Sequence, residues 1–125
     1  MNSFDIDGVI YINKDILGVY PGPDDIIITG RSFEEFEETQ KMLEERGIKN
    51  EVIYNPLPFH KKSRITSGAH KAITLNLLKA EGKKIGVHFE DDPIQIEQIK
   101  KIAPWVNVIY LQHDLTNKEN VRHIE

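Results

Sequence analysis

The sequence predicts an α/β protein with a Rossmann-like, three-layer fold around an open, five-stranded parallel sheet. Two observations support this prediction. Apolar strands alternate with helical segments along the chain, and the strand at residues 26–29 is an apolar run rather than an alternating one. Numbered along the chain, the sheet strands are expected in the order 5-4-1-2-3. Their expected ranges are residues 3–6, 26–29, 51–54, 85–89 and 106–111.

A β-hairpin flap is expected directly after the first strand. Residues 9–20 alternate loosely between apolar and polar side chains, and Asn13, Lys14 and Asp15 suit the turn between two strands. The stretch before the second sheet strand has room for this flap and a short connection, but not for a helix as well. One face of the sheet is therefore expected to lack a helix. The polar tail, residues 112–125, or a second subunit of a homo-oligomer would cover that face.

Three helices are expected between the later strands. The first begins at Ser32, because Glu35 follows it at the spacing of a capping box, and it ends at Gly47. The second covers residues 69–81 and stops at a glycine. The third covers residues 93–103 and begins with a proline, which the first turn of a helix tolerates.

Length and composition narrow the class of protein. The 125 residues are expected to form one domain, since 39% hydrophobic and 29% charged residues are normal for a globular protein. The absence of cysteine excludes disulfides and thiolate metal sites. No apolar run is long enough to cross a membrane and no signal peptide is evident, so a cytoplasmic location is expected. A net charge of −4 argues against a general nucleic-acid binder.

Two carboxylates, Asp5 and Asp7, stand at the end of the first strand and are followed by Gly8. Alternate residues of a strand share a face, so both side chains are expected in one pocket, where their charges need a cation or a proton between them. Gly8 lets the backbone turn away sharply. The pattern suits metal-assisted phosphoryl chemistry, but it also occurs in calcium loops and ordinary turns.

Further polar residues follow the second and fourth strands or begin the helix between them. Ligands of an open parallel sheet bind at the carboxyl ends of its strands, so these residues are candidates for one site. They are Thr29, Gly30, Arg31, Lys71, Glu90, Asp91 and Asp92.

Several of these candidates also have a purely structural interpretation. The residues around Thr29 suit a simple turn from strand to helix, and Lys71 suits a solvated helix surface. Asp92 is a good N-cap for the helix that follows it. Asp91 is not needed for that cap, which makes it the better candidate for a metal ligand.

The order of these residues is similar to the motifs of the haloacid dehalogenase-like (HAD) superfamily. Residues 4–9, with the sequence FDIDGV, resemble the first motif, and residues 28–31, ITGR, resemble the second. Lys71 is the best fit to the third motif, and residues 87–93, VHFEDDP, resemble the fourth. The resemblance covers about the first four-fifths of the chain.

The resemblance implies a phosphatase mechanism that uses the two N-terminal carboxylates. Asp5 would attack phosphorus and form an aspartyl-phosphate. Asp7 would protonate the leaving oxygen and then deprotonate the water that hydrolyses the intermediate. Mg²⁺ would bind Asp5, Asp91 and the backbone carbonyl of Asp7, a set of oxygen ligands that suits a hard cation.

The resemblance also implies a phosphate-binding role for residues of the second and third motifs. The Thr29 hydroxyl and the amide of Gly30 would hold phosphoryl oxygens, and Lys71 would neutralise the charge on the nucleophile and the phosphate. Lys61 and Lys62 are alternatives to Lys71, although they lie in a loop upstream. Residues expected to support the site from behind it are Glu90, Asp92 and Arg31.

No cap domain fits between the motifs, so the chain is expected to be a small capless member of this superfamily. The basic loop at residues 59–64 favours a large anionic substrate, such as the terminal phosphate of a nucleotide or polynucleotide. Its candidate substrate-binding residues are Lys61, Lys62 and Arg64. The same loop could instead be solvated and balance the acidic helix at residues 34–45.

Two other functional classes remain open at this point. The chain could be a catalytically silent module that keeps the fold and binds phosphate, metal or a protein partner. It could also be a nuclease with a carboxylate cluster, which would cleave within a nucleic-acid strand rather than release phosphate from its end.

Overall fold

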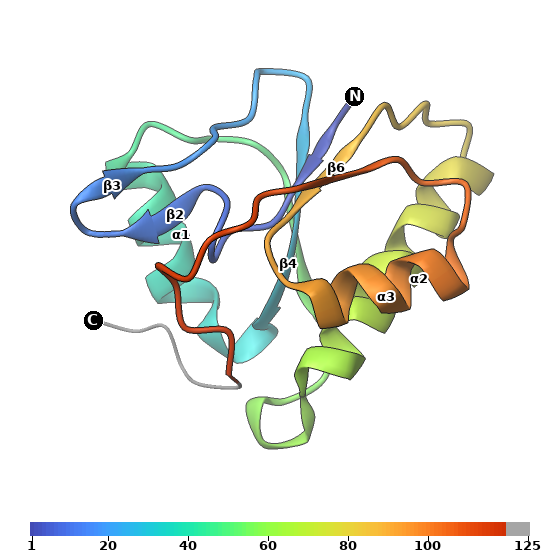
Figure 1. The fold of residues 1–125 in the computed structure, drawn as a ribbon. Coiled ribbons are helices and arrows are strands. Elements are labelled where there is room, and N and C mark those ends of the chain that lie inside the picture. Colours follow the sequence, from blue (N-terminus) through green and yellow to red (C-terminus); the bar gives the residue numbers. More distant parts are fainter. Residues whose placement is uncertain (120–125) are drawn as a thin grey trace.

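The computed structural model describes residues 1–119 and shows an α/β fold with two sheets (Figure 1). The larger sheet has five parallel strands in the order β5-β4-β1-β6-β7. These strands are β1 (Ser3–Phe4), β4 (Ile26–Ser32), β5 (Val52–Asn55), β6 (His88–Glu90) and β7 (Val108–Tyr110). The smaller sheet is an antiparallel hairpin of β2 (Tyr11–Asn13) and β3 (Ile16–Leu17), as the alternation in this segment predicted.

The strand labels differ from the expected order, 5-4-1-2-3, because that order numbered the strands of the main sheet alone. The hairpin takes the labels β2 and β3, so every later strand moves up by two. In the structure β1 pairs with β4 on one side and with β6 on the other. β5 lies beyond β4, and β7 lies beyond β6.

Side chains cap two helices at the positions that the sequence indicated. The 3-10 helix η1 (Phe33–Glu35) leads into α1 (Phe36–Glu45). Ser32 Oγ accepts a hydrogen bond from the Glu34 amide, and the Glu35 carboxylate accepts one from the Ser32 amide, so the expected capping box is present. Asp92 caps α3 (Pro93–Ile102) by accepting a hydrogen bond from the amide of Ile94.

The second long helix begins earlier than expected. A short 3-10 helix, η2 (Phe59–Lys61), precedes α2 (Arg64–Ala80), whose first residue lies five positions before the expected start at residue 69. Ser63 and Thr66 cap α2 reciprocally, with threonine in the place where a capping box usually has glutamate or glutamine. The earlier start places part of the basic loop on the helix.

The sheet separates two hydrophobic cores, because successive side chains of a strand point to opposite faces. Ile26 and Ile28 pack into the core formed with α2 and α3, whereas Ile27 packs into the core formed with α1 and the hairpin segment. The expectation that one face would lack a helix is therefore wrong. The connection from β1 to β4 has no helix, but Leu43 of α1 reaches that face from later in the chain.

The chain after β7 returns to the hairpin and stays close to the end of β1 (Figure 1). We call residues 112–119 the C-terminal strap; it is the described part of the expected polar tail. The remaining tail, residues 120–125, lies outside the described residues. None of the helices within residues 1–119 is long and apolar enough to cross a membrane.

Candidate active site

A buried charged cluster lies at the carboxyl ends of β1 and β6. Asp5 follows β1 directly, Glu90 is the last residue of β6, and Lys71 reaches them from α2. The Lys71 ammonium lies 3.1 Å from Asp5 Oδ2 and 2.8 Å from Glu90 Oε1. All three side chains are buried. The structure thus brings Lys71 to Asp5, whereas Lys62 pairs with Glu35.

Burial and charge shift the pKa values in this cluster in physically distinct ways. Burial alone would lower the pKa of Lys71, but Asp5 and Glu90 outweigh that effect and raise it, so Lys71 is a stable ammonium. Burial, followed by the charge of Glu90, raises the pKa of Asp5 well above its usual value, although Lys71 opposes this. One cation therefore faces two carboxylates, and the cluster favours a further proton or cation.

Asp91 adds a third buried carboxylate with the chemistry of a metal ligand. Carboxylate oxygens of Asp5, Glu90 and Asp91 all lie within 4.8 Å of one another. Asp91 Oδ2 is buried and accepts no hydrogen bond from the described residues. Gly8 has a positive φ of 87°, and a Cβ there would collide with the Asp91 carboxylate, so the glycine allows their close approach. This donor set fits a hard divalent cation.

The cluster differs from the expected metal ligands in one member. Glu90, and not Asp7, is the third carboxylate of the cluster. Asp7 was expected to bind metal through its backbone carbonyl, and that role stays a prediction. Glu90 already accepts hydrogen bonds from Lys71 and from the amides of Asp91 and Asp92. Asp5 and Asp91 are therefore the stronger candidates for direct ligands.

Asp7 lies in the same pocket as Asp5 but has a different cationic partner. Arg31 donates to both of its carboxylate oxygens, from Nε to Oδ2 at 2.9 Å and from Nη2 to Oδ1 at 2.8 Å. Arg31 also donates to the Thr39 hydroxyl, which holds the guanidinium against α1. Asp5 and Asp7 thus line one pocket, and each has its own cationic partner.

The second-motif residues divide between the pocket wall and the interior. Gly30 lines the pocket, and a Cβ there would lie 2.9 Å from Ser67 Oγ, so glycine lets α2 approach β4. Thr29 is fully buried, and its hydroxyl accepts a hydrogen bond from the Arg31 amide. Thr29 is absent from the residues that line the pocket, whereas Ser67, which the sequence did not single out, lines it.

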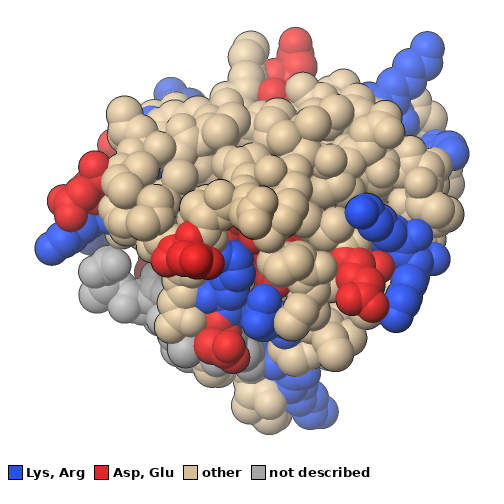
Figure 2. All heavy atoms as spheres, viewed as in Figure 1, with Lys and Arg blue, Asp and Glu red and all other residues tan. Residues whose placement is uncertain are grey.

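The expected substrate-binding cations are mostly engaged in ion pairs with neighbouring carboxylates. Lys62 Nζ lies 3.0 Å from Glu35 Oε1, and Arg64 donates to both oxygens of Asp92, at 2.9 and 2.7 Å. Lys61 is exposed on η2 and does not line the pocket. On the face seen in Figure 2, acidic and basic side chains are accordingly intermixed rather than gathered into one basic patch.

A neutral histidine behind the cluster was not apparent from the sequence. Ser3 and His88 are paired across β1 and β6, with 2.7 Å between Ser3 Oγ and His88 Nδ1. His88 Nε2 lies 3.2 Å from Glu90 Oε1. Burial and the nearby Lys71 charge lower the pKa of His88 to about 3, so the ring is neutral and its Nε2–H donates to Glu90. Only the strand register, which has no local sequence signal, brings these groups together.

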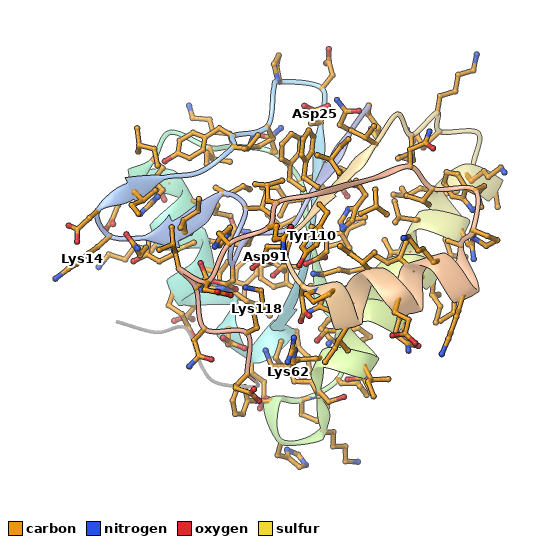
Figure 3. The ribbon with its side chains drawn as sticks, viewed as in Figure 1. Lys14, Asp25, Lys62, Asp91, Tyr110 and Lys118 are labelled. Carbon is orange, nitrogen blue, oxygen red and sulfur yellow. The ribbon has the colours of Figure 1, made fainter. Side chains whose placement is uncertain are left out.

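The pocket over the cluster is open to solvent. Its wall comes from the ends of β1, β4 and β6, the starts of α2 and α3, and residues 117–119. Figure 3 labels three of the lining residues, Lys62, Asp91 and Lys118. The pocket contains a buried carboxylate suited to nucleophilic attack, an ammonium and candidate metal ligands. Together these groups can stabilise negative charge on a bound group. No family model, curated protein or solved structure matches the chain.

The stability of the metal-free protein is expected to fall between pH 7 and pH 8. Burial, followed by the charge of Asp5, raises the pKa of Asp91 to about 8, so the folded state binds a proton that the unfolded state has released. Stability is lost as pH rises through this range, by about 1.4 kcal/mol per pH unit for one fully bound proton. His70 and His88 act in the opposite direction below about pH 7, because burial lowers their pKa values to about 4 and about 3, whereas the unfolded side chains titrate near 6.5. Above pH 7 both are largely neutral in either state.

Urea unfolding in the presence of EDTA at several pH values measures this slope. The Asp91→Asn variant is expected to have a flatter profile, because asparagine does not titrate. A wild-type profile that is flat or rises with pH across this range would contradict the prediction.

Proposed function

We propose that this chain is a Mg²⁺-dependent phosphomonoesterase of the HAD type, without a cap domain, that acts through an aspartyl-phosphate on Asp5. The observation that carries the proposal is the contact between buried Asp5 and Lys71. Beside this contact lies Asp91, whose Oδ2 accepts no hydrogen bond from the described residues. Lys71 offsets the repulsion between an anionic nucleophile and an anionic phosphate. Bound Mg²⁺ would neutralise further charge on the phosphoryl oxygens.

The proposed roles of the two N-terminal aspartates follow from their partners. Asp5 attacks phosphorus while its other oxygen stays against the Lys71 ammonium. Asp7 protonates the leaving oxygen and later accepts a proton from water. For the first of these roles Asp7 must be protonated and must exchange at least one of its bonds with Arg31 for the leaving oxygen.

The same Asp7–Arg31 pair is the observation that favours the second candidate function. Two short hydrogen bonds from a guanidinium stabilise the carboxylate form, which cannot donate a proton. A catalytically silent module that binds metal or phosphate would keep this pair intact. It would bind a divalent cation and a phosphate analogue, but release no phosphate from a monoester.

Release of inorganic phosphate from an aryl phosphate, with Mg²⁺ or with EDTA, separates these candidates. We expect Mg²⁺-dependent turnover by the wild type and none by Asp5→Asn. Turnover that is equal in both proteins would exclude an enzymatic role for Asp5. Metal binding by the wild type without turnover would favour the silent module.

The proposed substrate class is a phosphomonoester on a nucleotide or at a polynucleotide end. The open pocket and exposed Lys61, next in sequence to the pocket-lining Lys62, support this class. The ion pairs of Lys62 and Arg64 leave few cations for a long polyanion. For a 3′-phosphorylated oligonucleotide, kcat/KM is therefore expected to fall by about sevenfold between roughly 50 and 200 mM salt, as for two phosphate contacts.

An end-labelled oligonucleotide distinguishes the remaining classes in the same assay. Release of phosphate from the end supports the proposed class, and internal cleavage identifies a nuclease. Turnover of the aryl phosphate without any action on the oligonucleotide would restrict the substrate to small molecules.

A further inference from the structure

The C-terminal strap is anchored to the segment that follows β1. His113 Nε2–H donates to the Gly8 carbonyl at 2.8 Å, and the Thr116 hydroxyl donates to the Ile12 carbonyl at 2.6 Å. Both acceptors are backbone groups close to the aspartate pair. These two anchors carry the strap across the site, so that residues 117–119 form part of the pocket wall.

The strap places Lys118 beside the candidate metal ligand Asp91 (Figure 3). Lys118 Nζ lies 3.5 Å from Asp91 Oδ2, the buried oxygen that accepts no hydrogen bond from the described residues. The ammonium is also held by the His113 carbonyl at 2.8 Å. The Lys118 side chain is 17% exposed and that of Asp91 is 3% exposed, so the pair is largely removed from water.

We propose that Lys118 is an internal cation that competes with the divalent metal for Asp91, so that the strap regulates loading of the site. The effect on activity rests on the proposed function, whereas the competition itself is a statement about metal affinity. An ammonium and a divalent cation on the same carboxylate oxygen would repel each other strongly in a partly buried pocket. Metal binding at Asp91 therefore requires Lys118 to move away.

The displacement needs little rearrangement of the rest of the strap. Lys118 has a flexible four-carbon stem, and its ammonium contacts Asp91 and the His113 carbonyl. The anchors at His113 and Thr116 do not involve the ammonium group. Because coupling between two binding events is reciprocal, whatever draws Lys118 away from Asp91 also raises the metal affinity, and bound metal releases Lys118.

Titration of the full chain with Mn²⁺, followed by the electron paramagnetic resonance signal of unbound Mn²⁺, measures this competition without any turnover. For Lys118→Met we expect the Kd for Mn²⁺ to be lower by roughly tenfold, the size of one lost charged contact. Lys118→Arg keeps the cation and should bind Mn²⁺ about as the wild type does. Lys14→Met removes one positive charge at the exposed hairpin turn, away from Asp91 (Figure 3), and should also leave the Kd unchanged.

Each outcome decides the question. A lower Kd for Lys118→Met alone supports competition at Asp91. The same Kd in Lys118→Met and the wild type, or a higher one, overturns the proposal, and so does an equal decrease in Lys14→Met. If the wild type and Lys118→Met show no Mn²⁺ binding that Asp91→Asn abolishes, the metal site of the proposed function is wrong as well. Far-ultraviolet circular dichroism confirms that each variant is folded.

Discussion

Asp5→Asn is expected to lower phosphate release from an aryl phosphate by about 10⁴-fold or more, because it removes the proposed nucleophile. Asparagine fills nearly the same volume and cannot form an aspartyl-phosphate. The Lys71 ammonium would keep its contact with Glu90 at 2.8 Å. The loss should therefore appear in kcat and not as a failure of the pocket to form. Steady-state kinetics with saturating Mg²⁺ measures it.

Asp7→Asn is the matched control for the loss of Asp5. It removes one carboxylate from the same pocket, but the proposed role of Asp7 is that of a general acid and base, whose loss costs about 10²- to 10⁴-fold in rate. Burial and the Glu90 charge raise the pKa of Asp5, which means that they disfavour its carboxylate form. Because asparagine carries no charge, the Asp5→Asn protein should be at least as stable as the wild type. A larger loss of activity for Asp7→Asn than for Asp5→Asn would reverse the proposed roles.

The parts of the fold that the sequence predicted well are those with local signals. The capping box of Ser32 and Glu35 and the N-cap at Asp92 are sequence-local hydrogen-bond patterns, and both are present. The start of α2 was misplaced because Ser63 and Thr66 form a cap without the usual glutamate. The face expected to lack a helix was a different kind of error, since a helix later in the chain covers it.

Site residues at the ends of the strands could be predicted from the strand order. Contacts that depend on strand register or on the path of the C-terminal strap could not. Asp5, Glu90 and Asp91 converge because β1 and β6 are neighbouring parallel strands. The hydrogen bond between Ser3 and His88 depends on strand register over 85 positions, for which no residue pattern exists. The strap contacts likewise depend on how the chain returns after β7.

The cationic partner of each aspartate could not be predicted from the local sequence either. Alternation predicts a common face for Asp5 and Asp7, and both line the pocket. It says nothing of the cations, which come from α2 in one case and from the end of β4 in the other. Arg31 is thus a partner of Asp7, a closer role than the supporting one expected for it.

Lys71→Met is expected to lower the free energy of unfolding by about 3–5 kcal/mol at neutral pH in EDTA, because it leaves two buried carboxylates without their cation. Lys71 is fully buried and is the shared partner of Asp5 and Glu90. Methionine is apolar and of similar length, so the lost volume is small and the effect is mainly electrostatic. Urea unfolding monitored by circular dichroism measures the loss.

A double-mutant cycle with Glu90→Gln separates charge from packing. If the loss arises from charge, adding Glu90→Gln to Lys71→Met should restore part of the stability, since one unpaired buried carboxylate is removed. Saturating Mg²⁺ should stabilise Lys71→Met more than the wild type, because a cation bound among the carboxylates replaces the missing charge. Equal stabilisation of both proteins by Mg²⁺, with no recovery in the double variant, would mean that packing of the Lys71 stem rather than its charge holds this cluster together.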